Sequence, residues 1–147
     1  MLQTLVIKGV FPNLNDYVNK ERTNRYAAAA VKKKETERVF WECKAQHLKP
    51  VPKIDEVTIT FYNPTTRSDF DNLEFAQKFI WDGLVLAKII PDDSQKYTPS
   101  RKTFIHELDR TNPRITLEIT TLEDTASYSV PQLQGKILSK KAKKSKI

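Results

Sequence analysis

The stretch "DEVTITFYNPTTRSDFDNLEFAQKFIWDGLVLA", residues 55–87, decides how the chain is expected to fold. In its first part, "DEVTITFY", apolar and polar side chains alternate, with Val57, Ile59 and Phe61 on one side. A period of two is typical of a β-strand that buries one face. From about residue 72 to residue 87 the apolar residues recur at helical spacing. The stretch therefore predicts a strand followed by a helix that packs on it.

Further strands are expected on both sides of this unit. Residues 2–11 are apolar on both faces, which favours a central strand. A short strand and a turn are expected in "KIIPDDSQK", residues 88–96. Residues 97–108 and 114–120 indicate a pair of strands joined through "DRTNP".

A second helix is predicted from about residue 26 to residue 47, because a run of alanines is followed by apolar residues at helical spacing. The preceding "PNLNDY" is expected to be a turn. The order β-α-β-α-β-β favours an α/β fold, a single domain with a mixed β-sheet and flanking helices over residues 1–122. Residues 123–147 are predicted to be a polar linker and a basic, flexible tail, which either keeps the chain in solution or contacts nucleic acid weakly.

Composition excludes several classes of protein. Hydrophobic residues make up 39% of the chain and no apolar run reaches membrane-spanning length, so no membrane contact is expected. The start lacks the features of a signal peptide, which favours the cytoplasm. Cys43 is the only cysteine, so no internal disulfide and no thiolate metal cage can form. With 3 glycines there is no glycine-rich phosphate loop, and no nucleotide cofactor is expected.

The formal net charge of +7 is distributed unevenly. Six lysines stand at the end of the chain, and without them the net charge falls to +1. Residues 20–49 carry a net charge of +5, whereas residues 69–93 carry −4. A basic arm beside an acidic region suits a phosphate polymer that is handled through a metal ion.

Each aspartate of the acidic region has an ordinary structural explanation. Asp71 precedes an acid by three residues and could cap a helix in a capping box. Asp92 and Asp93 follow a proline and could simply form a turn. Asp82 stands four residues after Lys78, so the two could form an ion pair on the helix.

Taken together, these acids favour a metal site. Asp69 and Asp71 can share one face at the end of an extended segment, and Lys78 and Asp82 fall on the same helical face as Asp71. The returning chain is expected to bring the two turn aspartates to the same end of the sheet. Carboxylates without cysteine favour Mg²⁺ or Mn²⁺. The expected chemistry is metal-assisted phosphodiester hydrolysis, in which Lys78 neutralises charge in the transition state.

The sequence resembles the RusA family of Holliday-junction resolvases. The residues that carry this resemblance are "DFDNL", Lys78, "DGL" and the pair "DD". The flanking "PNLNDY" and "NPRITLEI" are also similar to that family, and the resemblance covers roughly residues 5 to 120.

This resemblance implies a RusA-like fold and a homodimeric, Mg²⁺-dependent endonuclease that makes paired cuts in four-way DNA junctions, as in a bacterial or phage-infected cell. The implied metal ligands are Asp69, Asp71 and Asp93, with Asp92 as the alternative to Asp93, and all of these except Asp92 are also implied to be catalytic. The implied catalytic lysine is Lys78. The chain departs from the family pattern at one point: "EFAQ" separates "DNL" from this lysine, whereas in the family the lysine follows almost at once. The lysine is thereby shifted along the helix by nearly one turn relative to the family pattern.

Seven basic residues are candidates for contacts with DNA phosphates, although they could equally form a solvated surface. They are Lys20, Arg22, Arg25, Lys32, Lys33, Lys34 and Arg67. The two tryptophans could stack on bases or pack in a core or a dimer, and no role is expected for the two histidines. Two other functions remain open: a branched- or single-stranded-DNA-binding protein without catalysis, and a broader branched-DNA or flap nuclease.

Overall fold

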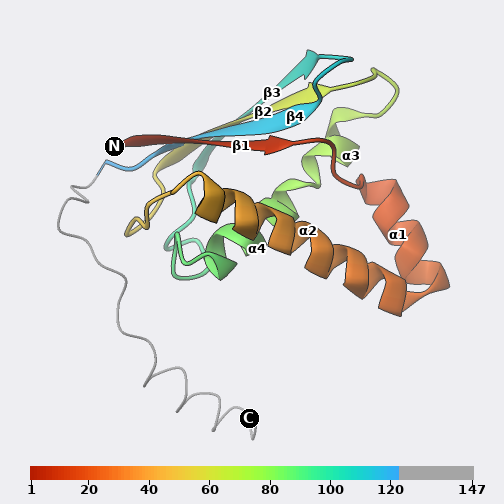
Figure 1. Ribbon diagram of the computed structural model, residues 1–147, viewed down its shortest axis with the longest axis horizontal. Helices are drawn as coiled ribbons and strands as arrows, with labels where there is room; N and C mark the ends of the chain where they lie inside the picture. The colour runs from red at the N-terminus through yellow and green to blue at the C-terminus, as the bar shows by residue number, and fades with distance from the viewer. Residues whose placement is uncertain (123–147) are drawn as a thin grey trace, which may run out of the picture.

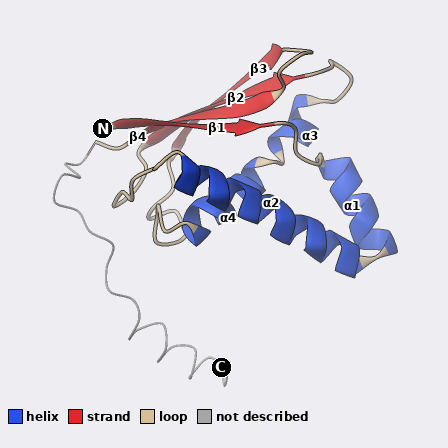
Figure 2. Ribbon diagram, in the orientation of Figure 1, coloured by secondary structure: helices blue, strands red, loops and turns tan. Residues whose placement is uncertain are grey.

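The computed structural model describes residues 1–122, in which helices lie against one face of a mixed β-sheet (Figures 1 and 2). The strands are β1 (Leu2–Lys8), β2 (Glu56–Asn63), β3 (Arg101–Leu108) and β4 (Arg114–Thr120). The helices are α1 (Leu14–Thr23), α2 (Arg25–Ala45), α3 (Phe70–Glu74) and α4 (Gln77–Leu86). The predicted α/β class and single mixed sheet are confirmed. The predicted linker and tail, residues 123–147, lie outside the described residues.

The four strands are arranged in the order β1-β4-β2-β3. β2 and β3 are parallel, and β4 is antiparallel to both of its neighbours, β1 and β2. The expected pairing of β3 with β4 is therefore wrong, because β4 crosses over to lie between β1 and β2. The side chains explain this choice: Ile115, Leu117 and Ile119 of β4 are all buried, whereas β3 has no fully buried residue. The more apolar strand takes the central position.

β1 lies at the edge of the sheet, so the expectation of a central first strand is also wrong. At the free edge of β1, the backbone of Val6 is hydrogen-bonded to the side chain of Gln46, which directly follows α2. The Val6 amide donates to Gln46 Oε1 at 2.9 Å, and Gln46 Nε2 donates to the Val6 carbonyl at 2.7 Å. One glutamine thus supplies the hydrogen bonds that a neighbouring strand would make.

The prediction of α2 is confirmed, but α1 occupies residues that were expected to form only a turn. Asn13 is the N-cap of α1, and its side chain accepts a hydrogen bond from the Asp16 amide at 2.9 Å. Asn24 caps α2 in the same way, through the amides of Tyr26 and Ala27. Asparagine favours turns and helix N-caps for the same reason, so a turn signal can also mark the start of a helix.

The predicted helix over residues 72–87 is present but interrupted between α3 and α4. At the interruption the Ala76 amide donates to the Leu73 carbonyl at 3.2 Å, and the Lys78 amide to the Phe75 carbonyl at 3.0 Å. These bonds span three residues, so the chain is locally wound as a 3₁₀ turn. The short strand expected in residues 88–96 does not form. Instead Lys88, with φ of 62°, turns the chain out of α4.

The core lies between the sheet and the pair α2–α4. Helix α4 buries Phe79, Ile80, Trp81, Gly83 and Leu84. A Cβ atom on Gly83 would lie 2.4 Å from Val39 Cβ of α2, so the two helices cross in contact at this glycine. No helix within residues 1–122 combines the length and the apolar character that crossing a membrane requires.

The sole cysteine belongs to this core and not to a reactive site. Cys43 is buried, and burial raises the pKa of its thiol to about 12. A thiol with so high a pKa is protonated at neutral pH and is a poor nucleophile.

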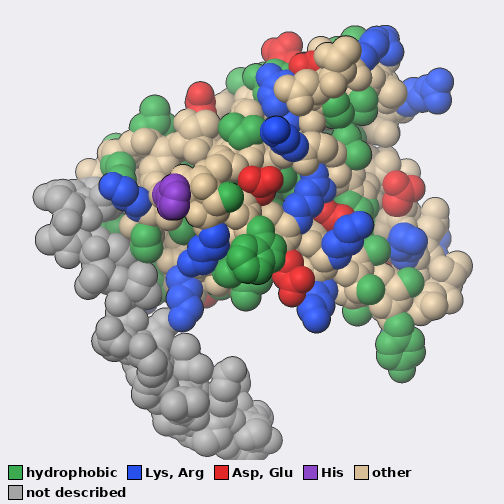
Figure 3. All heavy atoms as spheres, in the orientation of Figure 1, with side chains coloured by type: hydrophobic (Ala, Val, Ile, Leu, Met, Phe, Trp, Pro, Cys, Tyr) green, Lys and Arg blue, Asp and Glu red, His purple; other side chains and the backbone are tan. Residues whose placement is uncertain are grey.

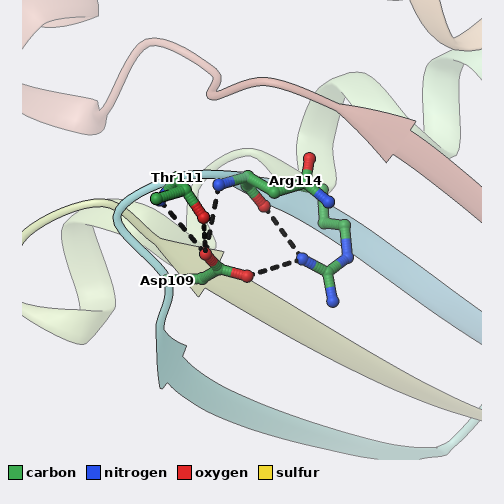
Figure 4. A network of polar contacts seen from close by, with 4 residues as sticks. Asp109, Thr111 and Arg114 are labelled. Carbon is green, nitrogen blue, oxygen red and sulfur yellow. Dashed lines mark hydrogen bonds and ion pairs between the residues drawn. The ribbon is translucent and has the colours of Figure 1, made fainter.

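The loop between β3 and β4 is closed by one carboxylate (Figure 4). Asp109 accepts hydrogen bonds from the amides of Thr111 and Asn112 at 3.2 and 3.1 Å, and from Arg114 Nη1 at 2.9 Å. The Arg114 guanidinium also lies 3.7 Å from the centre of the Tyr62 ring. These contacts, first of all the one with Arg114, lower the pKa of the Asp109 carboxyl.

Candidate functional site

The two groups of aspartates lie at opposite ends of the connection between β2 and β3. Asp69 and Asp71 follow the carboxyl end of β2, at α3. The segment after α4 is bound instead to residues that precede β2: the Val51 amide donates to the Ile89 carbonyl, and the Ile54 amide to the Tyr97 carbonyl, both at 2.9 Å.

The expectation that the turn aspartates return to the same end of the sheet is therefore wrong. A helix that connects two parallel strands carries the chain back from the carboxyl end of the first to the amino end of the second. Figure 1 shows α3 below the arrowheads of β2 and β3, with α4 running toward the other end of the sheet. Residues directly after such a helix begin at that other end.

Asp69 and Asp71 stand at the start of α3, and both side chains are exposed. Asp69 occupies the N-cap position of α3, but its side chain accepts no capping hydrogen bond. Asp71 lies in the first turn of α3 and both residues are exposed. The capping box expected for Asp71 does not form, because Glu74 turns to His106 instead. Within residues 1–122 neither aspartate carboxylate has a hydrogen-bond or ion-pair partner, so both are available to a cation.

The carboxyl end of the sheet is organised around His106 of β3. Its Nε2 lies 2.7 Å from Glu74 Oε2, and its Nδ1 lies 3.1 Å from Asn63 Nδ2. With the Asn63 amide donating to Nδ1, the proton of the neutral ring is on Nε2 and is donated to Glu74. The ring is stacked between Phe61, at 4.8 Å between ring centres, and Phe70, at 4.0 Å. His106 thus joins α3 to β2 and β3 by contacts on both faces and both nitrogens.

A cavity of about 320 Å³ lies beside this stack and is called here the threonine pocket. It is lined by Asn63, Thr65, Thr66, Ser68, Phe70, Leu73, His106, Glu107 and Leu108. The pocket lies at the carboxyl ends of two parallel strands, where open α/β sheets usually bind their ligands.

A second cavity, of about 180 Å³, is called the lysine pocket. It is lined by Lys78, Trp81, Asp82, Asp93, Thr98 and Lys102, so three of the residues singled out in the sequence do meet there. The ion pair expected between Lys78 and Asp82 is not formed within the described chain. Lys102 Nζ lies 5.3 Å from the centre of the Trp81 ring and 3.4 Å from Gln77 Oε1. The pocket therefore presents two lysines and two aspartates to solvent.

The two adjacent aspartates of the turn, Asp92 and Asp93, have different surroundings. Asp92 Oδ1 accepts a hydrogen bond from the Ser94 amide at 2.8 Å. Hydrogen bonds from the Ser94 side chain and then from its backbone lower the pKa of the Asp92 carboxyl. The turn explanation is thus confirmed for Asp92, whereas Asp93 faces the lysine pocket.

The seven basic candidates for DNA contacts are all exposed. Lys32 and Lys33 also line a groove of about 550 Å³ between α2 and α4, the α2–α4 groove, whose far wall includes Asp82 and Leu86. Because Asp82 also lines the lysine pocket, the two hollows are neighbours. Figure 3 shows Lys and Arg side chains at several places across this side of the molecule, with acidic side chains between them.

The acidic side chains do not gather into a complete metal site within residues 1–122. In the part of the chain that the structure describes, no group of three or more His, Cys, Asp or Glu side chains is placed to hold a metal ion. Asp92 and Asp93 therefore do not join Asp69 and Asp71. Two free carboxylates still fit Mg²⁺, which is commonly held by one or two carboxylates, several waters and the phosphates of a substrate.

Three residues of these sites were missed in the sequence. His106 was given no role, Lys102 was not singled out, and Phe70 was only the spacer between two aspartates. The alternation of β3 contained a usable signal, since Lys102, Phe104 and His106 share one face of a strand. Of the two tryptophans, Trp81 is buried, as the core explanation requires, whereas Trp41 is 64% exposed.

Neither the models of known protein families nor the curated protein sequences give a match to this chain.

Proposed function

We propose that the protein is a Mg²⁺-dependent endonuclease that cuts branched DNA, with the four-way junction as its substrate. Mn²⁺ is the natural substitute for Mg²⁺ at carboxylate ligands. The observation that carries this proposal is the pair Asp69 and Asp71, directly after the carboxyl end of a parallel strand. Both carboxylates are exposed, and neither has a hydrogen-bond or ion-pair partner among residues 1–122. They belong to the motif that resembles the RusA resolvases.

In this mechanism Asp69 and Asp71 hold the metal ion, and His106 fixes the short helix on which they stand. When bound, the metal supplies an activated water and stabilises the leaving oxygen. Lys78 is seven residues beyond Asp71, which corresponds to roughly 10 Å of helical rise. We therefore assign Lys78, with Lys102, to a phosphate contact at the lysine pocket rather than to the bond that is cut. Asp93 lines the same pocket and adds a negative charge to it.

The exposed basic residues would hold the rest of the DNA. Contacts with phosphates position a nucleic acid without reading its sequence. Lys32 and Lys33 line the α2–α4 groove, which adjoins the lysine pocket at Asp82, so a phosphate chain can follow both hollows. Cutting two opposed strands of a junction requires two active sites, which a two-fold homodimer would supply.

A second candidate function is binding of branched DNA without cleavage. The separation of Asp93 from Asp69 and Asp71 favours it, since no third acidic ligand completes the metal site within residues 1–122. A broader branched-DNA or flap nuclease would use the same two carboxylates and differ only in the substrate it accepts.

The deciding experiment measures nicking of a labelled immobile four-way junction with and without Mg²⁺. We expect paired, symmetry-related nicks that require the metal. Asp69→Asn and Asp71→Asn should each reduce the rate by at least about 100-fold, because loss of even an outer-shell partner of a metal site costs ten- to a hundredfold. Asp16→Asn is the matched control, since Asp16 is also an exposed aspartate in the first turn of a helix.

The same assay separates the two turn aspartates. Asp93→Asn removes a negative charge from the lysine pocket and should therefore strengthen junction binding, whereas Asp92→Asn should change only the stability of the turn. Tight binding of the junction without nicks in either Mg²⁺ or Mn²⁺, unaltered by Asp71→Asn, would contradict the nuclease and leave the DNA-binding protein.

A further inference from the structure

Phe70 is an unusual surface aromatic because it is exposed and yet held in place. Its side chain is 60% exposed. At the same time its ring lies parallel to His106, with an interplanar angle of 6° and 4.0 Å between ring centres. One face of the ring is thus covered by the histidine. The exposed fraction must therefore belong to the opposite face and the edges.

The covered face is fixed by a chain of contacts that runs into the sheet. His106 rests on Phe61 of β2, with 4.8 Å between ring centres and an interplanar angle of 9°. Its two nitrogens are held by Glu74 and Asn63. Phe70 is the outermost ring of a three-ring stack whose inner ring, Phe61, is buried. A flat apolar surface is thus held ready, so binding on it would cost little conformational entropy.

Hydrogen-bonding groups lie next to this flat surface. The threonine pocket is lined by Phe70 and by three residues that carry a hydroxyl group, Thr65, Thr66 and Ser68. A hydroxyl can both donate and accept a hydrogen bond, so it does not select one pattern of donors and acceptors. An aromatic face beside a row of hydroxyls fits a planar heterocycle with a polar edge.

We propose that Phe70 and the threonine pocket form a stacking site for an unpaired nucleobase. This inference rests on the proposed function and names the feature of the substrate that the site would recognise: a base that is unstacked at a branch or bulge, rather than a paired duplex. Stacking accepts any base because every base has a π face, and the hydroxyl groups accept varied edges.

The position of Phe70 between Asp69 and Asp71 links this site to the proposed chemistry. A base stacked on Phe70 would place its own phosphate close to both carboxylates. The like charges would repel each other unless a divalent cation lay between them. The stacking site therefore predicts that a divalent cation strengthens binding of an unpaired base.

The expected contribution of one stacked base to the binding affinity is large enough to measure. Stacking of one base on an aromatic side chain contributes about 1–3 kcal/mol, which corresponds to roughly a 5- to 150-fold change in affinity. The pocket volume of about 320 Å³ is at the lower end of the range for small-molecule sites, which suits one base rather than several.

The test compares two labelled DNA duplexes that differ only in one unpaired adenine bulge. Binding is measured by fluorescence anisotropy with Ca²⁺ in place of Mg²⁺, for the wild-type chain and for Phe70→Leu, Phe70→Trp and Tyr26→Leu. We expect the wild-type chain to prefer the bulged duplex by at least about 5-fold. Phe70→Leu should abolish this preference, and Phe70→Trp should restore it. Tyr26→Leu should keep it, because Tyr26 is an 80% exposed aromatic outside the pocket.

A second readout is the fluorescence of 2-aminopurine placed at the bulge. Stacking should quench this fluorescence in the wild type and in Phe70→Trp but not in Phe70→Leu. An equal preference for the bulge in wild type and Phe70→Leu would overturn the proposal. Binding of adenosine monophosphate as tight as binding of the bulged duplex would also overturn it, since the site would then serve free nucleotides.

The outcome is separable from that of the nuclease assay. Loss of the bulge preference in Phe70→Leu, in a protein that cuts no junction, would support the stacking site and remove the nuclease. Normal junction cutting with an unaltered bulge preference in Phe70→Leu would remove the stacking site alone.

Discussion

The two halves of the connection between β2 and β3 are held to the sheet in different ways. Helix α4 buries five of its ten residues, among them Phe79, Ile80 and Leu84. Helix α3 buries none, and it is attached to the sheet through Phe70 and Glu74, both on His106. One half is fixed by packing of many apolar atoms, and the other by a few specific contacts around one histidine.

This difference separates stability from candidate function. Apolar burial contributes roughly 25 cal/mol per Å² whichever side chains supply it, so α4 can anchor the fold without presenting polar groups. At α3 the side chains that are not used for packing include both aspartates and the open face of Phe70. Binding groups are commonly found on such less buried segments, positioned by a rigid scaffold. Two substitutions test how far the two halves are independent, and a third tests the neighbouring loop between β3 and β4. They are given in order of decreasing effect.

Gly83→Ala should destabilise the whole fold. Alanine would improve helix propensity by about 1 kcal/mol, but its Cβ would lie 2.4 Å from Val39 Cβ. Overpacking of this kind costs roughly 1–3 kcal/mol, occasionally more. At so short a separation we expect a cost at the upper end of this range, about 3 kcal/mol. The net loss in the free energy of unfolding, measured by urea denaturation, should then be about 2 kcal/mol. Leu86→Ala, at a 48% exposed position of the same helix, should cost less than about 1 kcal/mol. Equal losses for the two variants would contradict the close crossing of α2 and α4.

His106→Phe should loosen α3 and leave α4 unchanged. Phenylalanine can keep the ring stack, but it removes the hydrogen bonds with Glu74 and Asn63. We expect a loss of about 1 kcal/mol in the free energy of unfolding. In hydrogen exchange, amides of residues 70–76 should exchange faster, whereas those of α4 should stay protected. The chain's other histidine supplies the control: His47→Asn changes an exposed residue whose φ of 55° asparagine tolerates. Faster exchange throughout α4 in His106→Phe would show that the two halves are one unit.

Asp109→Asn should alter the acid sensitivity of the loop that borders the carboxyl end. The hydrogen bond from Arg114 is the first cause of the lowered pKa of Asp109. A carboxyl with a lower pKa in the folded than in the unfolded chain contributes stability above its ordinary pKa, about 3.9, and this stability is lost as pH falls toward the folded pKa. The difference in stability between wild type and variant should therefore shrink on acidification. This is the smallest of the three effects, because the carboxylate is only half-buried and water partly screens its interactions. With Asp16→Asn as reference, a difference that grows at low pH would contradict the assignment.

Local sequence patterns predicted where helices and strands form better than they predicted which of them lie side by side. The alternation in β2 placed Val57, Ile59 and Phe61 on the buried face, and all three are buried. The extent of α2 was predicted for the same kind of reason, since period and propensity are properties of adjacent residues. The helix α1 was missed because asparagine marks both turns and N-caps.

By itself the sequence determined the α/β class and most of the strands and helices. Only the tertiary structure decided that β4 lies between β1 and β2, that Asp93 is carried away from Asp69 and Asp71, and that His106 joins them to the sheet. The physical reason is the range of the interactions. Periodicity and capping act over a few residues along the chain, whereas strand order and the meeting of His106 with Glu74, which are 32 residues apart, depend on how whole elements pack.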